Sequence, residues 1–180
     1  MIKMKRRKLS VADITTIGVM VAVIEVCKVT LMSIPNVELT SFWIVMFTLF
    51  FGWRMLFVIP VFILIEGSMF GFGTWWVMYL YAWPLLSLLT WFGKKQDSVI
   101  YFSVLSGGFG LFFGLLCSIP YFFIGLADGG VINGMMAALT WWVAGIPWDV
   151  VHGISNFILM MILYRPVKSI MKKLPVHINN

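Results

Sequence analysis

Three polar residues near the C-terminal end of the chain have the spacing of a binding site on one helix face. In the segment 145–156, a helix that begins at Pro147 would place Asp149, His152 and Asn156 at i, i+3 and i+7. A carboxylate, an imidazole and an amide on one face can bind a polar ligand. Their neighbours are apolar, and polar groups at membrane depth are costly unless they face protein or a water-filled cavity. We interpret the three as the floor or wall of a binding site; the simpler alternative is a helix cap with a packing histidine.

The sequence offers little for catalysis beside these residues. Asp149 and His152 have the types of a base dyad, but Ser155 lies on another helix face and no other nucleophile is near. The chain has no phosphate-binding glycine loop followed by Lys and Ser or Thr, and no His-Glu-x-x-His or Cys/His cluster. Cys27 and Cys117 lie in apolar runs and are expected in the core. We therefore expect no catalytic residue, no metal and no intrinsic cofactor.

The composition of the chain indicates a membrane protein. Of its 180 residues, 61% are hydrophobic and 11% are charged, a balance that is not typical of soluble domains. Long apolar runs with scattered glycines favour helices over the alternating strands of a barrel. We predict an all-α integral membrane protein, a single domain over residues 1–180 that lies in the bilayer and does not bind nucleic acid.

Breaks in the apolar runs divide the chain into six expected membrane helices. They cover approximately residues 11–33, 39–52, 54–66, 75–92, 98–126 and 147–173. The run 42–65 is either one helix with a buried Arg54 or two short helices with a turn at Gly52. Residues 127–134 are expected to form a polar loop. Residues 135–144 are too few to span a bilayer and are expected to be a re-entrant piece or an outer extension of a neighbouring helix.

Basic residues favour the turn at Gly52 and set the orientation. With two short helices, all of the 13 Lys and Arg residues except Lys28 fall on one side, as expected of the cytoplasmic side of a membrane protein. A single long helix would instead place Lys94 and Lys95 outside. The prediction is a six-transmembrane-helix bundle with both termini cytoplasmic, in which the N-terminal apolar run is retained as the first helix and not cleaved as a signal peptide.

This orientation brings the unexplained polar residues to the outer half of the bundle. They are Glu25, Lys28, Asn36, Glu38, Glu66, Asp128, Asn133, Asp149, His152 and Asn156. Their convergence predicts a cavity that opens outward. Many aromatic residues lie at the same end, and an interfacial belt accounts for part of them. Tyr79 and Trp83 lie deeper than a belt requires and are expected, with Trp75 and Trp142, to contact a flat or bulky organic ligand.

The order of these features resembles a known family, the substrate-binding S components of energy-coupling factor (ECF) transporters, which import vitamins into bacteria. The resemblance spans essentially the whole chain. The segments that carry it are Pro35-Asn-Val-Glu-Leu39, Gly52-Trp-Arg54, Glu66 leading into Gly71-Phe-Gly-Thr-Trp75, Tyr79 to Pro84, and Gly145-Ile-Pro-Trp-Asp149 with His152 and Asn156. The chain length, the number of helices, the basic cytoplasmic ends and the pair of short helices are similar as well.

The resemblance implies a transport subunit of an ABC importer in the bacterial cytoplasmic membrane, and not an enzyme. Such subunits bind a vitamin in an outward-facing cavity and dock onto a transmembrane coupling protein with two ATPases, which use ATP and magnesium. The substrate-binding residues expected here are Asn36, Glu38, Glu66, Trp75, Tyr79, Trp83, Asn133, Trp142, Asp149, His152 and Asn156. Gly18 and Ala22 match the small-residue docking motif on the first helix, where the family usually has alanine at both positions.

The loop 35–39 and the Trp-rich fourth helix are most similar to the cobalamin-specific branch of the family. Cobalamin is therefore the expected ligand, with pantothenate, folate and a thiamine or pyridoxine precursor as alternatives. The acidic residues disfavour an anionic ligand in direct contact with them. Two other functions stay open: a proton-coupled transporter with Glu25, Glu66 and Asp149 as relays, and, less favoured, an intramembrane lipid-modifying enzyme that uses Asp149 and His152.

Overall fold

The computed structural model describes residues 9–174, and the regular structure in this part of the chain is entirely helical. The elements are α1 (Val11–Leu31), α2 (Thr40–Phe51), the 3-10 turn η1 (Gly52–Arg54), α3 (Met55–Phe70), α4 (Thr74–Phe92), α5 (Val99–Leu111), α6 (Phe113–Cys117) and α7 (Ile119–Met171). The prediction of an all-α fold is confirmed. Three stretches are long and apolar enough to cross a membrane: Val11–Leu31, Thr40–Phe70 and Phe113–Met171.

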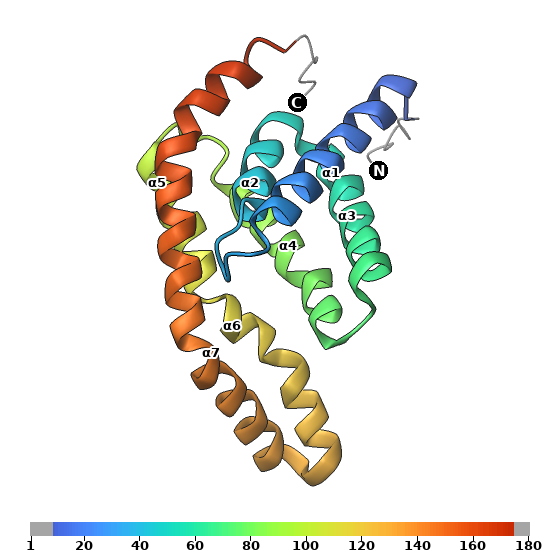
Figure 1. Ribbon diagram of the computed structural model, residues 1–180, viewed down its shortest axis with the longest axis vertical. Coiled ribbons are helices and arrows are strands. Elements are labelled where there is room, and N and C mark those ends of the chain that lie inside the picture. Colours follow the sequence, from blue (N-terminus) through green and yellow to red (C-terminus); the bar gives the residue numbers. More distant parts are fainter. Residues whose placement is uncertain (1–8, 175–180) are drawn as a thin grey trace, which may run out of the picture.

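Helix α2 lies at the centre of the bundle, surrounded by α1, α3, α4 and α7 (Figure 1). Ten of its 12 residues are buried, which is the pattern of a helix enclosed by protein on all sides. Side chains from the neighbouring helices complete the core, among them Ile24, Phe62, Leu86 and Met160. A helix of 12 residues is only about 18 Å long. The surrounding helices shield it from lipid and water.

The helical segment breaks at Gly52, where the distribution of basic residues in the sequence predicts a turn. Gly52 has a φ of +52°, which favours glycine, and a Cβ there would lie 3.1 Å from the ring of Trp91. Helix α3 then continues past Glu66 to Phe70, four residues beyond its predicted end. Gly67 lies inside this helix, and the rings of Phe72 and Trp76 there leave no room for a Cβ. The loop between α3 and α4 is therefore limited to residues 71–73.

The last part of the chain is a helical hairpin, which corrects two expectations. Gly129 and Gly130 have non-helical backbone angles, and the chain reverses direction there (Figure 1). The predicted polar loop 127–134 is thus reduced to a glycine pair. The predicted helix start at Pro147 is wrong, because Pro147 lies inside a helix that runs through residues 135–144 to Met171. A proline within a helix removes one hydrogen bond, which the long helix tolerates here.

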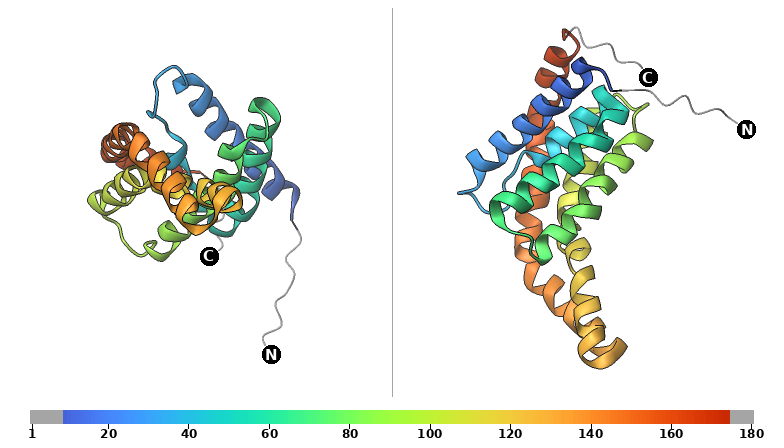
Figure 2. Two further views of the ribbon diagram at one scale, coloured as in Figure 1. Left: turned by 90° about the horizontal axis from the view of Figure 1, so that it is seen from below. Right: turned by 90° about the vertical axis from the view of Figure 1, so that its right-hand side faces the viewer.

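The two arms of this hairpin approach each other closely through glycine. A Cβ on Gly125 would lie 2.6 Å from the carbonyl oxygen of Asn133, and one on Gly134 would lie 2.7 Å from that of Phe122. The hairpin projects beyond the other helices (Figure 2). Its second arm, residues 131–171, is about 60 Å long at 1.5 Å per residue, roughly twice the hydrocarbon thickness of a bilayer.

The predicted helix 98–126 is interrupted twice. Helix α5 ends at Leu111, α6 covers only Phe113–Cys117, and the first arm of α7 begins at Ile119. The interruption at Phe112 leaves the amide of Gly114 without a partner in a preceding turn, and this amide instead binds a side chain of α7, described below. The break therefore frees the Gly114 amide to bind a buried side chain of α7.

Candidate functional site

A polar network joins the loop after α1 to helix α7. Glu38 accepts a hydrogen bond from His152 Nε2 at 3.0 Å, and it accepts two from Ser41, from the backbone nitrogen at 2.9 Å and from Oγ at 2.5 Å. Asn156 Nδ2 donates to Ser41 Oγ at 3.1 Å. His152 and Asn156 are 4% and 2% exposed. Two of the three residues that define the predicted helix face therefore bind the carboxylate and hydroxyl at the start of α2.

The charge of Glu38 is stabilised by this network. Burial alone would raise the pKa of Glu38, but the hydrogen bonds from His152 and Ser41 outweigh burial and lower it. Glu38 also caps α2, because it accepts from the Ser41 backbone in the first turn of that helix. The carboxylate is therefore ionised at neutral pH and holds the loop against α7.

Asn36 takes part in the same junction through its backbone. Its φ is +58°, a left-handed conformation that asparagine tolerates. Its carbonyl oxygen accepts a hydrogen bond from Ser155 Oγ at 3.1 Å, while the residue itself is exposed. The sequence singled out Asn36 for its side chain, whereas its observed contact is made by the main chain.

Asp149 belongs to a neighbouring contact between α6 and α7. Its Oδ1 accepts a hydrogen bond from the amide of Gly114 at 2.9 Å, and its Oδ2 is buried without a hydrogen-bond partner in the described chain. A Cβ on Gly114 would collide with the carboxylate. The other ring nitrogen of His152, Nδ1, is likewise buried and unpartnered, and the ring meets Phe113 edge-on at 5.0 Å.

A second polar cluster joins α1 to α3. Lys28 forms an ion pair with Glu66, whose exposed fraction is 0%. Glu66 Oε1 and both carboxylate oxygens of Glu25 are buried without a hydrogen-bond partner in residues 9–174. Lys28 also interacts electrostatically with Glu25 and Glu38, so the two polar clusters are neighbours. Together they place three carboxylates near one lysine.

An open pocket of about 330 Å³ lies against this cluster. It is lined by Lys28, Val29, Met32, Glu66, Phe70, Trp75 and Tyr79. The Lys28 ammonium lies 5.2 Å from the ring centre of Phe70 and 5.4 Å from that of Tyr79. Trp75 and Tyr79 meet edge to face at 5.2 Å. The pocket is thus lined by three aromatic rings and by Glu66, a carboxylate with one unpaired oxygen.

Of the eleven predicted substrate-binding residues, three line this pocket, Glu66, Trp75 and Tyr79, and eight do not. Trp83 is buried behind Tyr79 and packs on Phe62, Phe109 and Phe113. Asn133 is exposed near the turn of the hairpin, where it faces Gly129, and Trp142 is half-buried on the second arm. None of these three residues lines the pocket. Their residue types and their place in the outer half do not specify which side of each helix faces the cavity.

Sequence reasoning missed Lys28, Ser41 and Phe70 as site residues. Lys28 carried a usable signal, because it is the one basic residue that the predicted topology leaves on the outer side. An isolated lysine inside an apolar helix is expected to have an acidic partner. Ser41 and Phe70 carried no such signal, since hydroxyls and phenyl rings are common throughout the chain.

The face of α1 that carries Gly18 and Ala22 is open. Both residues are exposed, and a Cβ built on Gly18 would meet no atom within 4 Å. No element of the described chain therefore covers these two small residues. Their exposure leaves room for close approach of another helix.

Comparisons with protein-family models, with curated proteins and with solved structures found no match to this chain. Residues 9–174 contain no group of three or more His, Cys, Asp and Glu side chains arranged to hold a metal ion. The groups that the site offers to a ligand are its carboxylates, its lysine and its aromatic rings.

Proposed function

We propose that this protein is the substrate-binding subunit of an ECF-type vitamin importer in the bacterial cytoplasmic membrane. The observation that carries the proposal is Glu66, a fully buried carboxylate that lines the pocket, with one oxygen paired to Lys28 and the other without a partner. An unpaired buried acceptor is costly, and a ligand donor that occupies the pocket would remove this cost. Three aromatic rings beside it supply the apolar surface of a ligand site.

The pocket favours a small ligand with a ring and a positively charged or hydrogen-bond-donating group. Glu25, Glu38 and Glu66 outnumber Lys28 in this region, so the field attracts cations. Aromatic faces also attract cations. A thiamine or pyridoxine precursor fits these requirements better than the anionic pantothenate or folate. Cobalamin, the ligand that the resemblance suggests, would need the pocket of about 330 Å³ to widen.

The proposed topology has six spans with both termini in the cytoplasm. The spans are α1, α2, α3, α4, the segment formed by α5, α6 and the first arm of α7, and the second arm of α7. Gly18 and Ala22, exposed on α1, are proposed to dock onto a transmembrane coupling protein that carries two ATPases. ATP and magnesium would be used by those partners, so this chain acts as a transport subunit and not as an enzyme.

The test is retention of a small molecule by the purified protein. Mass spectrometry of the molecule that copurifies with the wild type identifies the ligand, and binding is then measured for Glu66→Gln. We expect this change to weaken binding by about tenfold or more, because it removes the charge and one acceptor. Asp97→Asn is the matched control, since Asp97 is an exposed carboxylate paired with Lys168 at the other end of the bundle. Equal binding by wild type and Glu66→Gln would overturn this site.

A second candidate is an autonomous proton-coupled transporter. The observation that favours it is Glu25, whose two carboxylate oxygens are buried without a hydrogen-bond partner in the described chain, beside Lys28. Such a group can exchange a proton during transport. Reconstituted vesicles separate the two functions: uptake driven by a proton gradient without any partner supports the second, and uptake only with the coupling module and ATP supports the first.

A further inference from the structure

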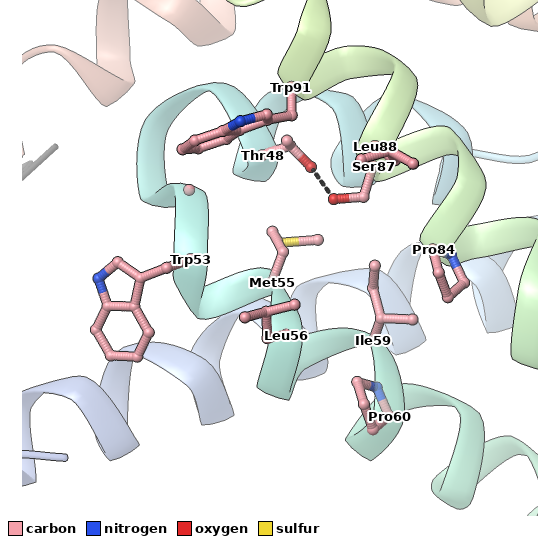
Figure 3. Close-up of a pocket in the computed structure, with 11 residues that line it drawn as sticks. Thr48, Trp53, Met55, Leu56, Ile59, Pro60, Pro84, Ser87, Leu88 and Trp91 are labelled. Atoms are coloured by element: carbon pink, nitrogen blue, oxygen red, sulfur yellow. Dashed lines mark hydrogen bonds between the residues drawn. The ribbon is translucent and has the colours of Figure 1, made fainter. Parts of the chain in front are cut away.

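A second cavity lies at the opposite end of the bundle from the polar clusters. This crevice has a volume of about 490 Å³ and lies between α4 on one side and α2, η1 and α3 on the other (Figure 3). It reaches from Gly52 and Trp91 to the two prolines Pro60 and Pro84, which line it from α3 and α4. At 1.5 Å per residue, the helical segments along its walls are roughly 10 Å long.

The lining of the crevice is almost entirely apolar. Its two hydroxyl groups, on Thr48 and Ser87, bind each other at 2.9 Å, and Thr48 Oγ1 also donates to the carbonyl of Ile44 at 2.6 Å. These groups are therefore already paired and offer little to a polar ligand. Leu56 and Leu88 line the crevice and are 74% and 50% exposed, so the crevice opens sideways, where lipid tails surround a membrane protein.

Two cations lie beside the tryptophans of this crevice, and they differ in their partners. Arg54 lies 5.1 Å from the ring centre of Trp53 and is neutralised by Asp13. Lys94 lies 3.5 Å from the ring centre of Trp91 and has no ion-pair partner in the described part of the chain. Lys94 thus leaves a free positive charge at the rim of an apolar crevice.

We propose that the crevice binds one acyl chain of an anionic phospholipid, whose headgroup is held by Lys94. The apolar walls and the sideways opening fit a lipid tail, and the unpaired ammonium complements a phosphate. Basic pockets between membrane helices on the cytoplasmic side attract anionic headgroups in this way. The predicted orientation of the bundle makes the lipid a component of the inner leaflet, on the opposite side from the vitamin pocket.

Native mass spectrometry tests this proposal with two lipids that share their acyl chains, phosphatidylglycerol and phosphatidylcholine. The wild-type protein is expected to retain phosphatidylglycerol about fivefold better. Lys94→Gln should remove this preference. Lys95→Gln is the matched control, because Lys95 is an exposed neighbour that does not contact Trp91, and it should keep most of the preference. Both changes are on exposed side chains and leave the packed core untouched.

The role of the crevice itself is tested by filling it. Ser87→Phe should reduce retention of both lipids, and Leu56→Trp, at a more exposed position of the lining, provides a second variant in case the first does not fold. Equal retention of the two lipids by the wild type, or a preference that survives Lys94→Gln, would overturn the proposal. If the wild type is instead a dimer without bound lipid, and Ser87→Phe dissociates this dimer, the crevice binds a second copy of the chain. That result would also overturn the proposal.

Discussion

Two ion pairs join helix α1 to the segment that contains η1 and α3, one at each end of the bundle. Asp13 pairs with Arg54 at one end, and Lys28 pairs with Glu66 at the other, so the signs are reversed along α1. The Asp13 carboxylate accepts from the backbone nitrogen and Oγ of Ser10 at 3.1 and 2.8 Å, and from Nε and an Nη of Arg54 at 2.9 and 2.6 Å. Glu66 has one partner, and one of its oxygens has none.

The difference between these pairs separates a structural contact from a binding site. A buried charge that is fully hydrogen-bonded fixes the two elements that carry it. A buried carboxylate with a free oxygen retains part of the cost of its burial, and a ligand can remove that cost. We therefore expect the Asp13 pair to determine stability and the Glu66 pair to determine binding, and substitutions of Arg54 and Lys28 test that division.

The largest effect on stability is expected for Arg54→Met. The change removes two of the four hydrogen bonds of Asp13 and leaves a buried carboxylate without its counter-ion, which is the costly way to break such a pair. Thermal unfolding in detergent should show a midpoint several degrees lower, with ligand binding retained by the folded fraction. Adding Asp13→Asn should recover part of the loss. A single variant as stable as the wild type would show that this pair does not hold α1 in place.

At the other end, Lys28→Met should affect stability less and ligand choice more. The change removes one hydrogen bond from Glu66, whereas Arg54→Met removes two from Asp13, and water can enter the open pocket that Glu66 lines. Both oxygens of Glu66 become available, and a cationic ligand should therefore bind at least as well as to the wild type. Isothermal calorimetry with the identified ligand measures this. Loss of binding on Lys28→Met, together with full binding by Glu66→Gln, would reverse the roles of the two residues and would indicate an anionic ligand.

The shared helix face of three polar residues can be predicted from simple periodicity. Asp149, His152 and Asn156 are all buried, because spacings of three and four residues return to the same side of a helix wherever that helix begins. The turn at Gly52 could also be predicted from the sequence. Only a chain that turns there places Lys94 and Lys95 on the same side as the other basic residues. These features follow from local geometry and from the count of charges, and both can be read from a single chain.

Other parts of the site depend on tertiary contacts that no local pattern encodes. The sequence predicts a helix start at Pro147, but the helix continues through this residue because the chain reverses earlier, at the glycine pair 129–130. Trp83 was expected to contact the ligand, but it packs among other rings in the core. Residue type alone does not tell whether an aromatic side chain lines a cavity or fills the space behind it.

A smaller loss of stability is expected for Gly114→Ala, which tests the contact between α6 and α7. The new methyl group would collide with the Asp149 carboxylate and displace it from the Gly114 amide, at a cost of about 1–3 kcal/mol. Gly108→Ala is the matched control, because a Cβ there meets no atom within 4 Å and alanine favours the helix. Gly114→Ala should lower the midpoint of thermal unfolding relative to the wild type, and Gly108→Ala should raise it. Equal midpoints would mean that α6 shifts to accommodate the methyl group.

The smallest effect concerns Glu38, whose carboxylate joins the loop after α1 to His152 on α7 and to Ser41 on α2. Its pKa is lowered from the usual 4.5 because the bonds from His152 and Ser41 outweigh burial. A depressed folded-state pKa contributes stability that is present above the unfolded value and is lost as the pH falls through the folded value. Wild type should therefore exceed Glu38→Gln in thermal stability at about pH 7, and the gap should narrow below about pH 4. A gap that is constant with pH would mean that Glu38 acts by shape alone, and the loop would then owe its position to the bond between Ser155 and the Asn36 carbonyl.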